Sequence, residues 1–190
     1  MKFLCSTRKP RADSQRNREK LLEVAKAAFS ESGTDISLEE IARRAGVGIG
    51  TLYRHFPNRD AILADVYRRG VEQLAAAAAE LSSSHPPLEA LRAWMRLFVD
   101  YIATKKLIAP ALNAMAGGTT ELYAASGPVI TEAVELLITR ARAAGAIRED
   151  VAPLDLLHAL FGFAYGSAGP DWQPSALRLI DVLIDGLRRV

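Results

Sequence analysis

One short segment combines the side chains that a helix needs to read double-stranded DNA. Gly50 lets a helix approach a groove closely, and Thr51 offers a hydroxyl group to phosphate. Arg54 and His55 offer N–H groups that reach phosphate oxygens or base edges when a helix lies in the major groove. Tyr53 lies at the flank, where its ring can pack while its hydroxyl group reaches a phosphate. These five residues are therefore candidates for contacts with DNA.

A short helix and a tight turn precede this segment. Ser37 and Glu40 have the spacing of a capping box, which gives the helix a defined start. Gly46 follows the last apolar position and can adopt the left-handed conformation that ends a helix. The apolar residues between them recur at i, i+3, i+4 and i+7 and form one face: Leu38, Ile41, Ala42 and Ala45. The pattern predicts a helix over about 38–45.

The candidate residues themselves lie on a second helix, which begins directly after the turn. At about 100° per residue, Ile49, Leu52 and Phe56 cluster on one side, and the polar residues point away from it. Two short helices joined in this way form a helix-turn-helix. An ordinary helical hairpin with a polar surface would have the same spacing, so the spacing alone leaves both interpretations open.

The run over 46–63 reads Gly-Val-Gly-Ile-Gly-Thr-Leu-Tyr-Arg-His-Phe-Pro-Asn-Arg-Asp-Ala-Ile-Leu and resembles the signature of the TetR/AcrR family of transcriptional regulators. The family pattern is roughly Gly-Val-Ser-x-Gly-Thr-Leu-Tyr-x-His-Phe, followed by a short linker, a lysine or arginine, and an acidic residue. Gly48 departs from it, because the family usually has serine there. Glycine caps a helix at a cost of a few tenths of a kcal/mol but offers no hydroxyl group to phosphate. The predicted DNA-binding residues are Ser37, Gly48, Ile49, Gly50, Thr51, Tyr53, Arg54, His55 and Arg59, and the resemblance assigns Arg59 to a phosphate.

The composition is that of a globular protein. The chain has 190 residues, of which 49% are hydrophobic, enough for a core in one or two small domains. Cys5 is the one cysteine, which excludes a disulfide or a cysteine-based metal site within a monomer. The sequence has no signal-peptide core and no uninterrupted apolar run that approaches membrane-spanning length. We therefore expect a cytoplasmic protein with no membrane partner.

The net charge of +2 is unevenly distributed along the chain. Residues 1–60 hold 12 lysine and arginine residues against 8 aspartate and glutamate residues, whereas residues 61–190 hold 12 against 14. The basic part coincides with the helix-turn-helix. It includes an N-terminal arm that could lie along phosphates or in a minor groove, or could simply be solvated: Lys2, Arg8, Lys9 and Arg11.

Helical periodicity extends over almost the whole chain, and no alternating strand pattern or internal repeat competes with it. Asn58 is a candidate cap for the fourth helix. About nine helices are expected, over 14–32, 38–45, 49–56, 58–82, from 87 onward, 106–116, 128–144, 153–167 and 174–189. The prediction is an all-α fold with a three-helix helix-turn-helix head over 14–57. The resemblance implies that 58–190 form an effector-binding and dimerisation body.

The resemblance also implies that this body holds a small-molecule effector in a mainly apolar pocket. The candidate pocket residues are Trp94, Met95, Phe98, Tyr101, Asn113, Met115, Tyr123, Phe161 and Tyr165. Core packing is the alternative role for each aromatic residue among them. An effector would act by favouring a body conformation in which the DNA-binding heads move out of register. The sequence does not identify the effector.

The last two predicted helices are apolar on more than one side, so one face serves the fold and another needs a partner. The resemblance likewise implies a dimer interface formed by the two C-terminal helices of each subunit. The predicted interface residues are Leu157, Phe161, Gly162, Gly166, Leu177, Ile180, Leu183, Ile184 and Leu187. A dimer would place two heads on the half-sites of a palindromic operator. The alternative is that both helices are buried within one subunit.

Catalysis and cofactors have no support in the sequence. His55, His85 and His158 lack the spacing of a shared metal site, and we find no phosphate loop or nucleophile elbow. We therefore predict a sequence-specific DNA-binding transcriptional regulator that is not an enzyme. The resemblance implies a homodimeric repressor that a small molecule releases from its operator. The alternative is a helical ligand-sensing or interaction module without specific DNA binding, and the departure at Gly48 keeps it open.

Overall fold

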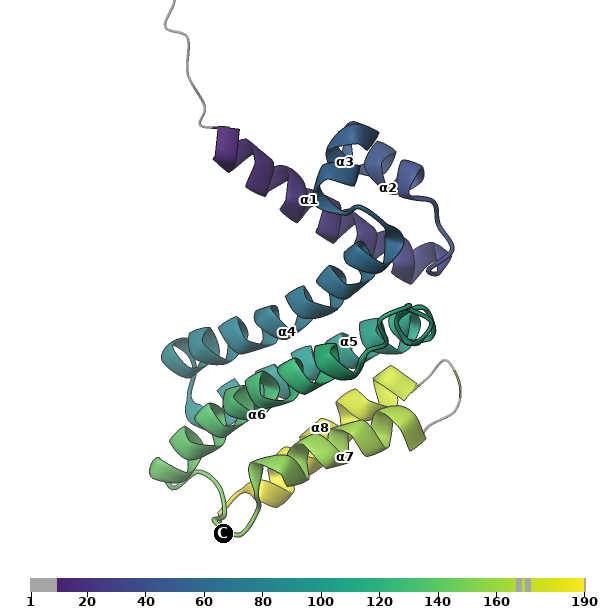
Figure 1. The fold of residues 1–190 in the computed structure, drawn as a ribbon. Helices are drawn as coiled ribbons and strands as arrows, with labels where there is room; N and C mark the ends of the chain where they lie inside the picture. Colours follow the sequence, from purple (N-terminus) through teal and green to yellow (C-terminus); the bar gives the residue numbers. More distant parts are fainter. Residues whose placement is uncertain (1–9, 167–168, 170–171, 190) are drawn as a thin grey trace, which may run out of the picture. The chain divides into compact units, whose positions relative to one another are not determined.

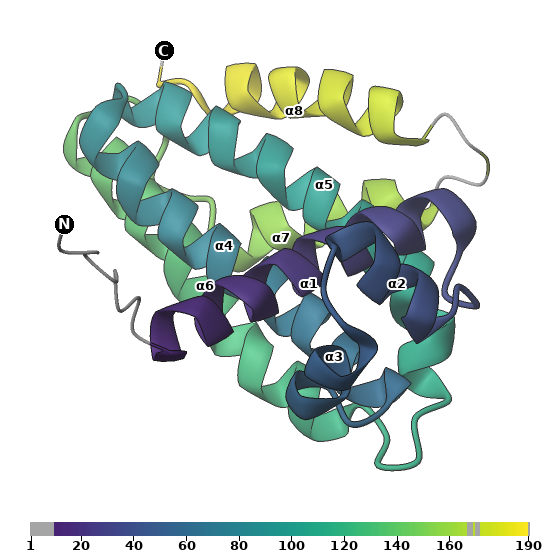
Figure 2. The same ribbon diagram turned by 90° about the horizontal axis from the view of Figure 1, so that it is seen from above.

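The computed structural model describes residues 10–166, 169 and 172–189. Lys2, Cys5, Arg8 and Lys9 lie outside the described residues. The all-α prediction is confirmed (Figures 1 and 2). The helices are α1 (Pro10–Ser32), α2 (Leu38–Ala45), α3 (Ile49–His55), α4 (Arg59–Ser84), α5 (Pro87–Asn113), α6 (Thr120–Ala143), α7 (Pro153–Gly166) and α8 (Trp172–Leu187). The chain divides into two compact units within α4, after Val66.

The first unit is a three-helix head that also includes the start of α4. α1 packs against both α2 and α3, and α2 ends at Gly46 in the left-handed conformation (φ 60°), as predicted. Asn58 caps α4, because its Oδ1 accepts a hydrogen bond from the backbone N–H of Ala61 (2.9 Å). The buried core of the head contains Leu21, Leu22, Ala25, Ala28, Phe29, Ile41, Leu52, Phe56, Ile62 and Leu63.

The second unit is a helical body in which α5 is the central element. α5 packs against α6, α7 and α8, and α7 packs against α6 and α8 (Figures 1 and 2). The indole N–H of Trp94 donates a hydrogen bond to the carbonyl of Leu74 (2.9 Å), which ties α5 to α4. The buried core of the body includes Leu91, Trp94, Met95, Phe98, Ile102, Val134, Leu137, Leu160, Ile180 and Ile184.

The fifth helix is longer than the sequence predicted. The segment over 106–116 is not a separate helix, because α5 continues to Asn113 with Pro110 inside it. A proline within a helix removes one backbone hydrogen bond and normally ends the helix. Ile108 and Leu112, on either side of the proline, are buried, so packing of the apolar stripe keeps the helix continuous.

The sixth helix also differs from its predicted bounds. α6 begins at Thr120 rather than at 128, and Pro128 lies inside it between the buried residues Ser126 and Ile130. The described residues therefore hold eight helices rather than nine. α6 is long enough and apolar enough to cross a membrane, judged by length and composition alone, because its mean hydropathy reaches 1.2. This is weak support for a membrane span, since core helices of soluble proteins pass the same test.

Candidate functional site

The predicted DNA-reading helix, α3, is anchored to the head by two apolar side chains. Leu52 and Phe56 are fully buried. Gly48 caps the helix with its backbone alone, since its carbonyl accepts hydrogen bonds from the N–H groups of Thr51 (2.8 Å) and Leu52 (3.1 Å). Ile49 was expected beside the two anchors but is 40% exposed, because it occupies the first position of the helix. The anchors therefore fix α3 from one side only.

The other side of α3 is open. Tyr53 is 43% exposed, Arg54 is exposed, and a Cβ atom added at Gly50 would meet no atom within 4 Å. Thr51, Arg54 and His55 border a hollow of about 510 Å³. Its other wall is formed by residues of α1: Asp13, Ser14 and Asn17. The head thus presents the candidate residues of α3 together with the first turns of α1.

Two other candidates are engaged in hydrogen bonds within the head. The hydroxyl group of Ser37 accepts a hydrogen bond from the backbone N–H of Glu40 (3.1 Å) and so caps α2. The hydroxyl group of Tyr53 donates to the carboxylate of Glu39 on α2 (3.3 Å). A phosphate contact by either hydroxyl group would have to replace or share these bonds.

The side chain of Glu40 belongs to a local charge cluster on α2. Only the Ser37 half of the expected capping box is formed. Its carboxylate accepts hydrogen bonds from the guanidinium groups of Arg43 (2.7 Å) and Arg44 (2.8 Å). These hydrogen bonds lower the pKa of Glu40 to about 2. Arg44 also pairs with Glu31 of α1 (2.9 Å), which links the first two helices at the surface of the head.

Arg59 is held by the backbone of the head. Its guanidinium group donates hydrogen bonds to the carbonyl of Thr34 and to that of Ile36 (2.7 Å). These bonds fix the loop between α1 and α2 to the start of α4, so Arg59 acts as a positioning residue. The phosphate contact assigned to it by resemblance stays a prediction.

Arg18 of α1 is a structural residue of the head that the sequence analysis did not select. It forms an ion pair with Asp65 of α4, and its guanidinium carbon lies 5.6 Å from the centroid of the Phe56 ring. No local motif marks this residue, because its ionic partner is 47 positions away in the sequence.

The predicted dimer residues separate into core and surface. Four of them are buried in the core of the subunit, so their assignment to an interface is corrected: Leu157, Ile180, Ile184 and Leu187. Phe161, Leu177 and Leu183 are half-buried, and Gly162 and Gly166 are exposed. Three exposed apolar residues on the same two helices were not predicted: Leu154 (47% exposed), Leu179 (36%) and Val182 (66%). The regular spacing along α8 marked the side that the fold itself buries.

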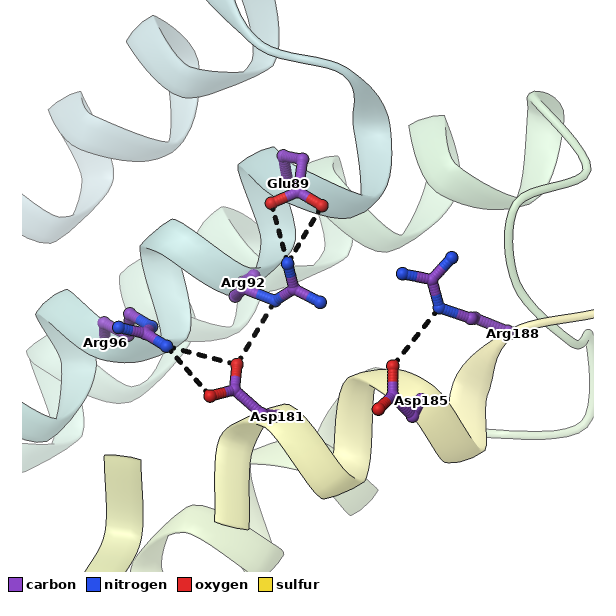
Figure 3. Close-up of polar contacts among 6 residues, drawn as sticks. All are labelled: Glu89, Arg92, Arg96, Asp181, Asp185 and Arg188. Carbon is purple, nitrogen blue, oxygen red and sulfur yellow. Dashed lines mark hydrogen bonds and ion pairs between the residues drawn. The ribbon is translucent and has the colours of Figure 1, made fainter. Parts of the chain in front are cut away.

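A set of ion pairs fixes the position of α8 on α5 (Figure 3). The carboxylate of Asp181 on α8 lies 3.3 Å from Arg92 and 3.0 Å from Arg96, both on α5. Glu89 pairs with Arg92 from the preceding turn of α5 (2.9 Å). These contacts hold α8 in an orientation that leaves Val182, the next residue after Asp181, at the surface.

The predicted effector residues also differ in burial. Trp94, Met95 and Phe98 are fully buried, so the alternative of core packing applies to these three. Tyr101 is 7% exposed. Met115, Tyr123 and Phe161 are half-buried, and Asn113 and Tyr165 are exposed.

Several of these side chains surround a lysine that the sequence analysis did not select. The ammonium group of Lys105 lies 4.6 Å from the ring centroid of Tyr123, 5.6 Å from that of Phe161 and 5.7 Å from that of Tyr67. Burial lowers the pKa of Lys105. Its position one turn after Tyr101 on the apolar stripe of α5 was the available sequence signal. We call Lys105 and its aromatic neighbours the Lys105 cluster: Tyr67, Tyr101, Lys105, Tyr123, Phe161 and Tyr165.

A groove of about 410 Å³ lies between α4 and α6 in the body. This volume is in the range of small-molecule sites. The groove is lined by Arg68, Val71, Glu72, Glu121, Leu122, Ala125, Ser126 and Val129. Over the described residues, no group of three or more His, Cys, Asp or Glu side chains is arranged to hold a metal ion.

Comparison with known proteins gives matches over both units of the chain. Residues 21–66 match the family model of bacterial regulatory proteins of the tetR family, and residues 86–189 match that of the SbtR-like transcriptional regulator C-terminal domain. A TetR transcriptional regulator from Streptomyces coelicolor is 45% identical, with a TM-score of 0.83 over 91% of this chain and 99% of that one. SmeT, in its complex with triclosan, is 26% identical to this chain in sequence, with a TM-score of 0.64 over 92% of this chain and 93% of that one. SmeT is the repressor of the Stenotrophomonas maltophilia multidrug efflux pump SmeDEF.

A curated relative matches part of the chain. An HTH-type transcriptional regulator from Staphylococcus aureus is 38% identical over 63 residues. The match spans 33% of this chain and 34% of the relative, so it covers about a third of each protein.

Proposed function

Because this chain belongs to the TetR family of bacterial transcriptional regulators, we propose that it is a homodimeric repressor that binds a palindromic operator and releases it when a small molecule binds the body. The family consists of transcriptional regulators rather than enzymes. A regulator of this kind acts on DNA in the cytoplasm, which is where we place this protein.

The observation that carries the proposal is the one-sided anchoring of α3. Leu52 and Phe56 are fully buried, whereas Tyr53 and Arg54 on the same helix are exposed. A helix fixed in this way can enter the major groove and bring Arg54 and Thr51 to base edges. The phosphate contacts that set its register would come from Tyr53, His55 and the first turns of α1.

Selection of bound fragments from random double-stranded DNA tests this proposal. We expect the selected sequences to share a palindrome whose half-sites lie about one helical turn apart, or a simple multiple of a turn. The control is a direct repeat of the same half-site at the same spacing, which should bind more weakly. Equal binding of the palindrome, the direct repeat and a scrambled sequence at low ionic strength would contradict a sequence-specific regulator.

The exposed apolar residues of α7 and α8 support the homodimer. Val182, Leu154 and Leu179 lie at the surface of these two helices, and Gly162 would let a second helix approach closely. Light scattering coupled to size exclusion measures the mass of the particle directly. A stable monomer at micromolar concentration would remove the dimer from the proposal.

The effector part of the proposal rests on the body. Both the groove between α4 and α6 and the Lys105 cluster offer apolar surface with a few polar groups, as small-molecule sites usually do. The similar protein SmeT forms a complex with triclosan, and small-molecule binding by this chain is our inference. A broad ligand screen by thermal shift, followed by operator release, tests it. If no compound both raises the melting temperature and weakens operator binding, this result counts against an effector switch.

A ligand-sensing module without specific DNA binding is the second candidate. One observation favours it: the cap of α3 is the backbone of Gly48 alone, and Tyr53 and Arg59 are engaged within the head. In that case the protein would bind a small molecule but would show no preference among oligonucleotides.

A further inference from the structure

The Lys105 cluster places a positive charge in an unusual environment. The rings nearest to the ammonium group come from three different helices: Tyr67 from α4, Tyr123 from α6 and Phe161 from α7. Lys105 itself is half-buried on α5. The charge therefore lies where four helices of the body meet.

No carboxylate that the structure describes neutralises this charge. Within the described part of the chain, no aspartate or glutamate lies within ion-pair distance of Lys105, and burial is the cause of its lowered pKa. A partly buried cation without a counter-ion is costly, and contacts with aromatic faces offset only part of that cost. Lys106, the next residue, differs: it donates a hydrogen bond to the carbonyl of Ala164 (2.6 Å) and lies 4.6 Å from the ring centroid of Trp172.

The hydroxyl groups around Lys105 add hydrogen-bond donors. Four of the five tyrosines of the chain belong to the cluster: Tyr67, Tyr101, Tyr123 and Tyr165. The hydroxyl group of Tyr101 is buried near that of Tyr67, but no described group meets it in good hydrogen-bond geometry. Burial raises the pKa of Tyr101, Tyr123 and Tyr165, so these hydroxyl groups keep their protons and can donate them in hydrogen bonds.

The backbone of α4 is shaped to admit Tyr101. A Cβ atom at Gly70 would lie 3.1 Å from Cδ2 of the Tyr101 ring, so glycine lets the ring pack directly against the helix. The ring in turn lies 6.1 Å from that of Tyr67 and 5.8 Å from that of Phe98. The unpartnered hydroxyl group is thus held by packing. At the other end of the cluster, Tyr165 is 54% exposed to solvent.

We propose that the Lys105 cluster binds an organic carboxylate with a flat, aromatic body, whose anionic group pairs with Lys105 and accepts a hydrogen bond from a tyrosine. The rings of Tyr67, Tyr123 and Phe161 would stack on the body of the ligand. That this ligand is also the effector rests on the proposed function. The binding itself does not, because it needs only the helical body.

Calorimetric titration of the full chain, without DNA, tests the binding. The probes are benzoate, phenylacetate and 2-naphthoate, each compared with its neutral amide. We expect at least one carboxylate to bind with a Kd about tenfold or more below that of its amide, because a charge-assisted hydrogen bond favours the anion. Lys105→Met should abolish this preference, and Lys105→Arg should retain part of it.

Lys106→Met is the matched control: it removes a cation that lies against Tyr165 (5.4 Å) and Trp172, away from the rings of Tyr67, Tyr123 and Phe161, and should leave the preference for the carboxylate unchanged. Circular dichroism of each variant confirms that it is folded. Tyr101→Phe, which removes only the buried hydroxyl group, should weaken carboxylate binding more than amide binding. The proposal is overturned if all three carboxylates bind no better than their amides, or if Lys105→Met binds them as the unmodified chain does.

The regulatory consequence has a separate readout. A carboxylate that binds should also lower the affinity for the selected operator. If the carboxylate binds the body but leaves operator affinity unchanged, the binding site is supported and its role as an effector site is contradicted. If the chain shows no operator preference at all, the proposed function fails while carboxylate binding is still decided by the titration.

Discussion

At the scale of single residues, the head separates side chains that can read DNA from side chains that build the reading surface. Arg54 is exposed on α3, whereas Arg59 donates both of its described hydrogen bonds to backbone carbonyls of Thr34 and Ile36. Both are arginines within one short stretch; the place of Arg54 on the second helix predicted a DNA contact, and the family resemblance implied one for Arg59. Their different surroundings predict different phenotypes.

Replacement of Arg54 by alanine should cost about 1–3 kcal/mol of operator binding and relax the sequence preference at one or two base pairs, because a base-edge contact is lost. Arg59→Ala should weaken binding to all sequences alike and also lower the melting temperature, since the loop between α1 and α2 loses its tie to α4. Fluorescence anisotropy with single-base operator variants measures both effects. An equal loss on every sequence from Arg54→Ala would identify Arg54 as a phosphate contact.

Lys105 carries a prediction about stability and pH. Burial lowers its pKa in the folded state below the ordinary value of 10.5, so the unfolded chain binds the proton more tightly. By linkage, this group makes the unliganded protein less stable below the lowered pKa, and the cost disappears as pH rises through the window up to 10.5. Lys105→Met should therefore raise the melting temperature at pH 7, by an amount that shrinks toward pH 10.

Differential scanning calorimetry of the two unliganded proteins from pH 7 to about pH 10 checks this difference. Lys106→Met serves as the comparison and should lower the melting temperature, because Lys106 donates a hydrogen bond to the backbone of Ala164. A drop in melting temperature on Lys105→Met would mean that the aromatic contacts outweigh the cost of burial.

At the scale of the elements, local signals predicted the head well. The caps at Ser37 and Asn58 and the turn at Gly46 lie where the sequence placed them, because each depends on neighbours within a few residues. The breaks expected before 106 and at 128 were wrong. The apolar stripe of α5 stays buried on both sides of 106, at Ile102 and Ile108, so the helix continues. At 128, packing of buried residues on both sides of Pro128 outweighs the local preference of proline.

Contacts between distant elements were not accessible to the same reasoning. In the sequence, Lys105 has the features of a surface lysine. Its aromatic neighbours come from α4, α6 and α7 and become apparent only in the fold. In the same way, the apolar pattern of α8 reveals that the helix is packed but not which side faces the core. Ile180 and Ile184 were expected at an interface and are buried, whereas Val182 is 66% exposed.

The link between α5 and α8 gives a prediction for elements. Asp181→Asn removes the charge that pairs with Arg92 and Arg96, and should destabilise the body by less than about 1 kcal/mol, since these side chains are partly exposed and screened. Asp185→Asn is the matched control: Asp185 lies one turn further along α8 and pairs only locally, with Arg188 (Figure 3). Urea unfolding measures both variants. A larger loss for Asp185→Asn would contradict an anchoring role for Asp181.

At the scale of the whole molecule, the proposed function requires two copies of the chain. A recognition helix reads only a few base pairs, so a pair of heads is needed to read both half-sites of a palindrome. The exposed apolar residues of α7 and α8 are the surface that we assign to this pairing, and Val182, at 66%, is the most exposed large apolar residue that the structure describes. A charge placed there tests the dimer without disturbing the core.

We expect Val182→Glu to raise the dimer Kd by roughly 100-fold or more, because each subunit would bury an unpaired carboxylate in the interface. Its thermal unfolding at low concentration should be little changed, since the side chain does not contribute to the core of the subunit. Operator affinity should fall together with dimerisation, whereas binding to an isolated half-site should persist. Leu136→Glu on α6, a similarly exposed apolar position at 45%, is the control and should remain dimeric. Sedimentation velocity across a concentration series separates the two variants, and an unchanged dimer in Val182→Glu would place the interface elsewhere on the body.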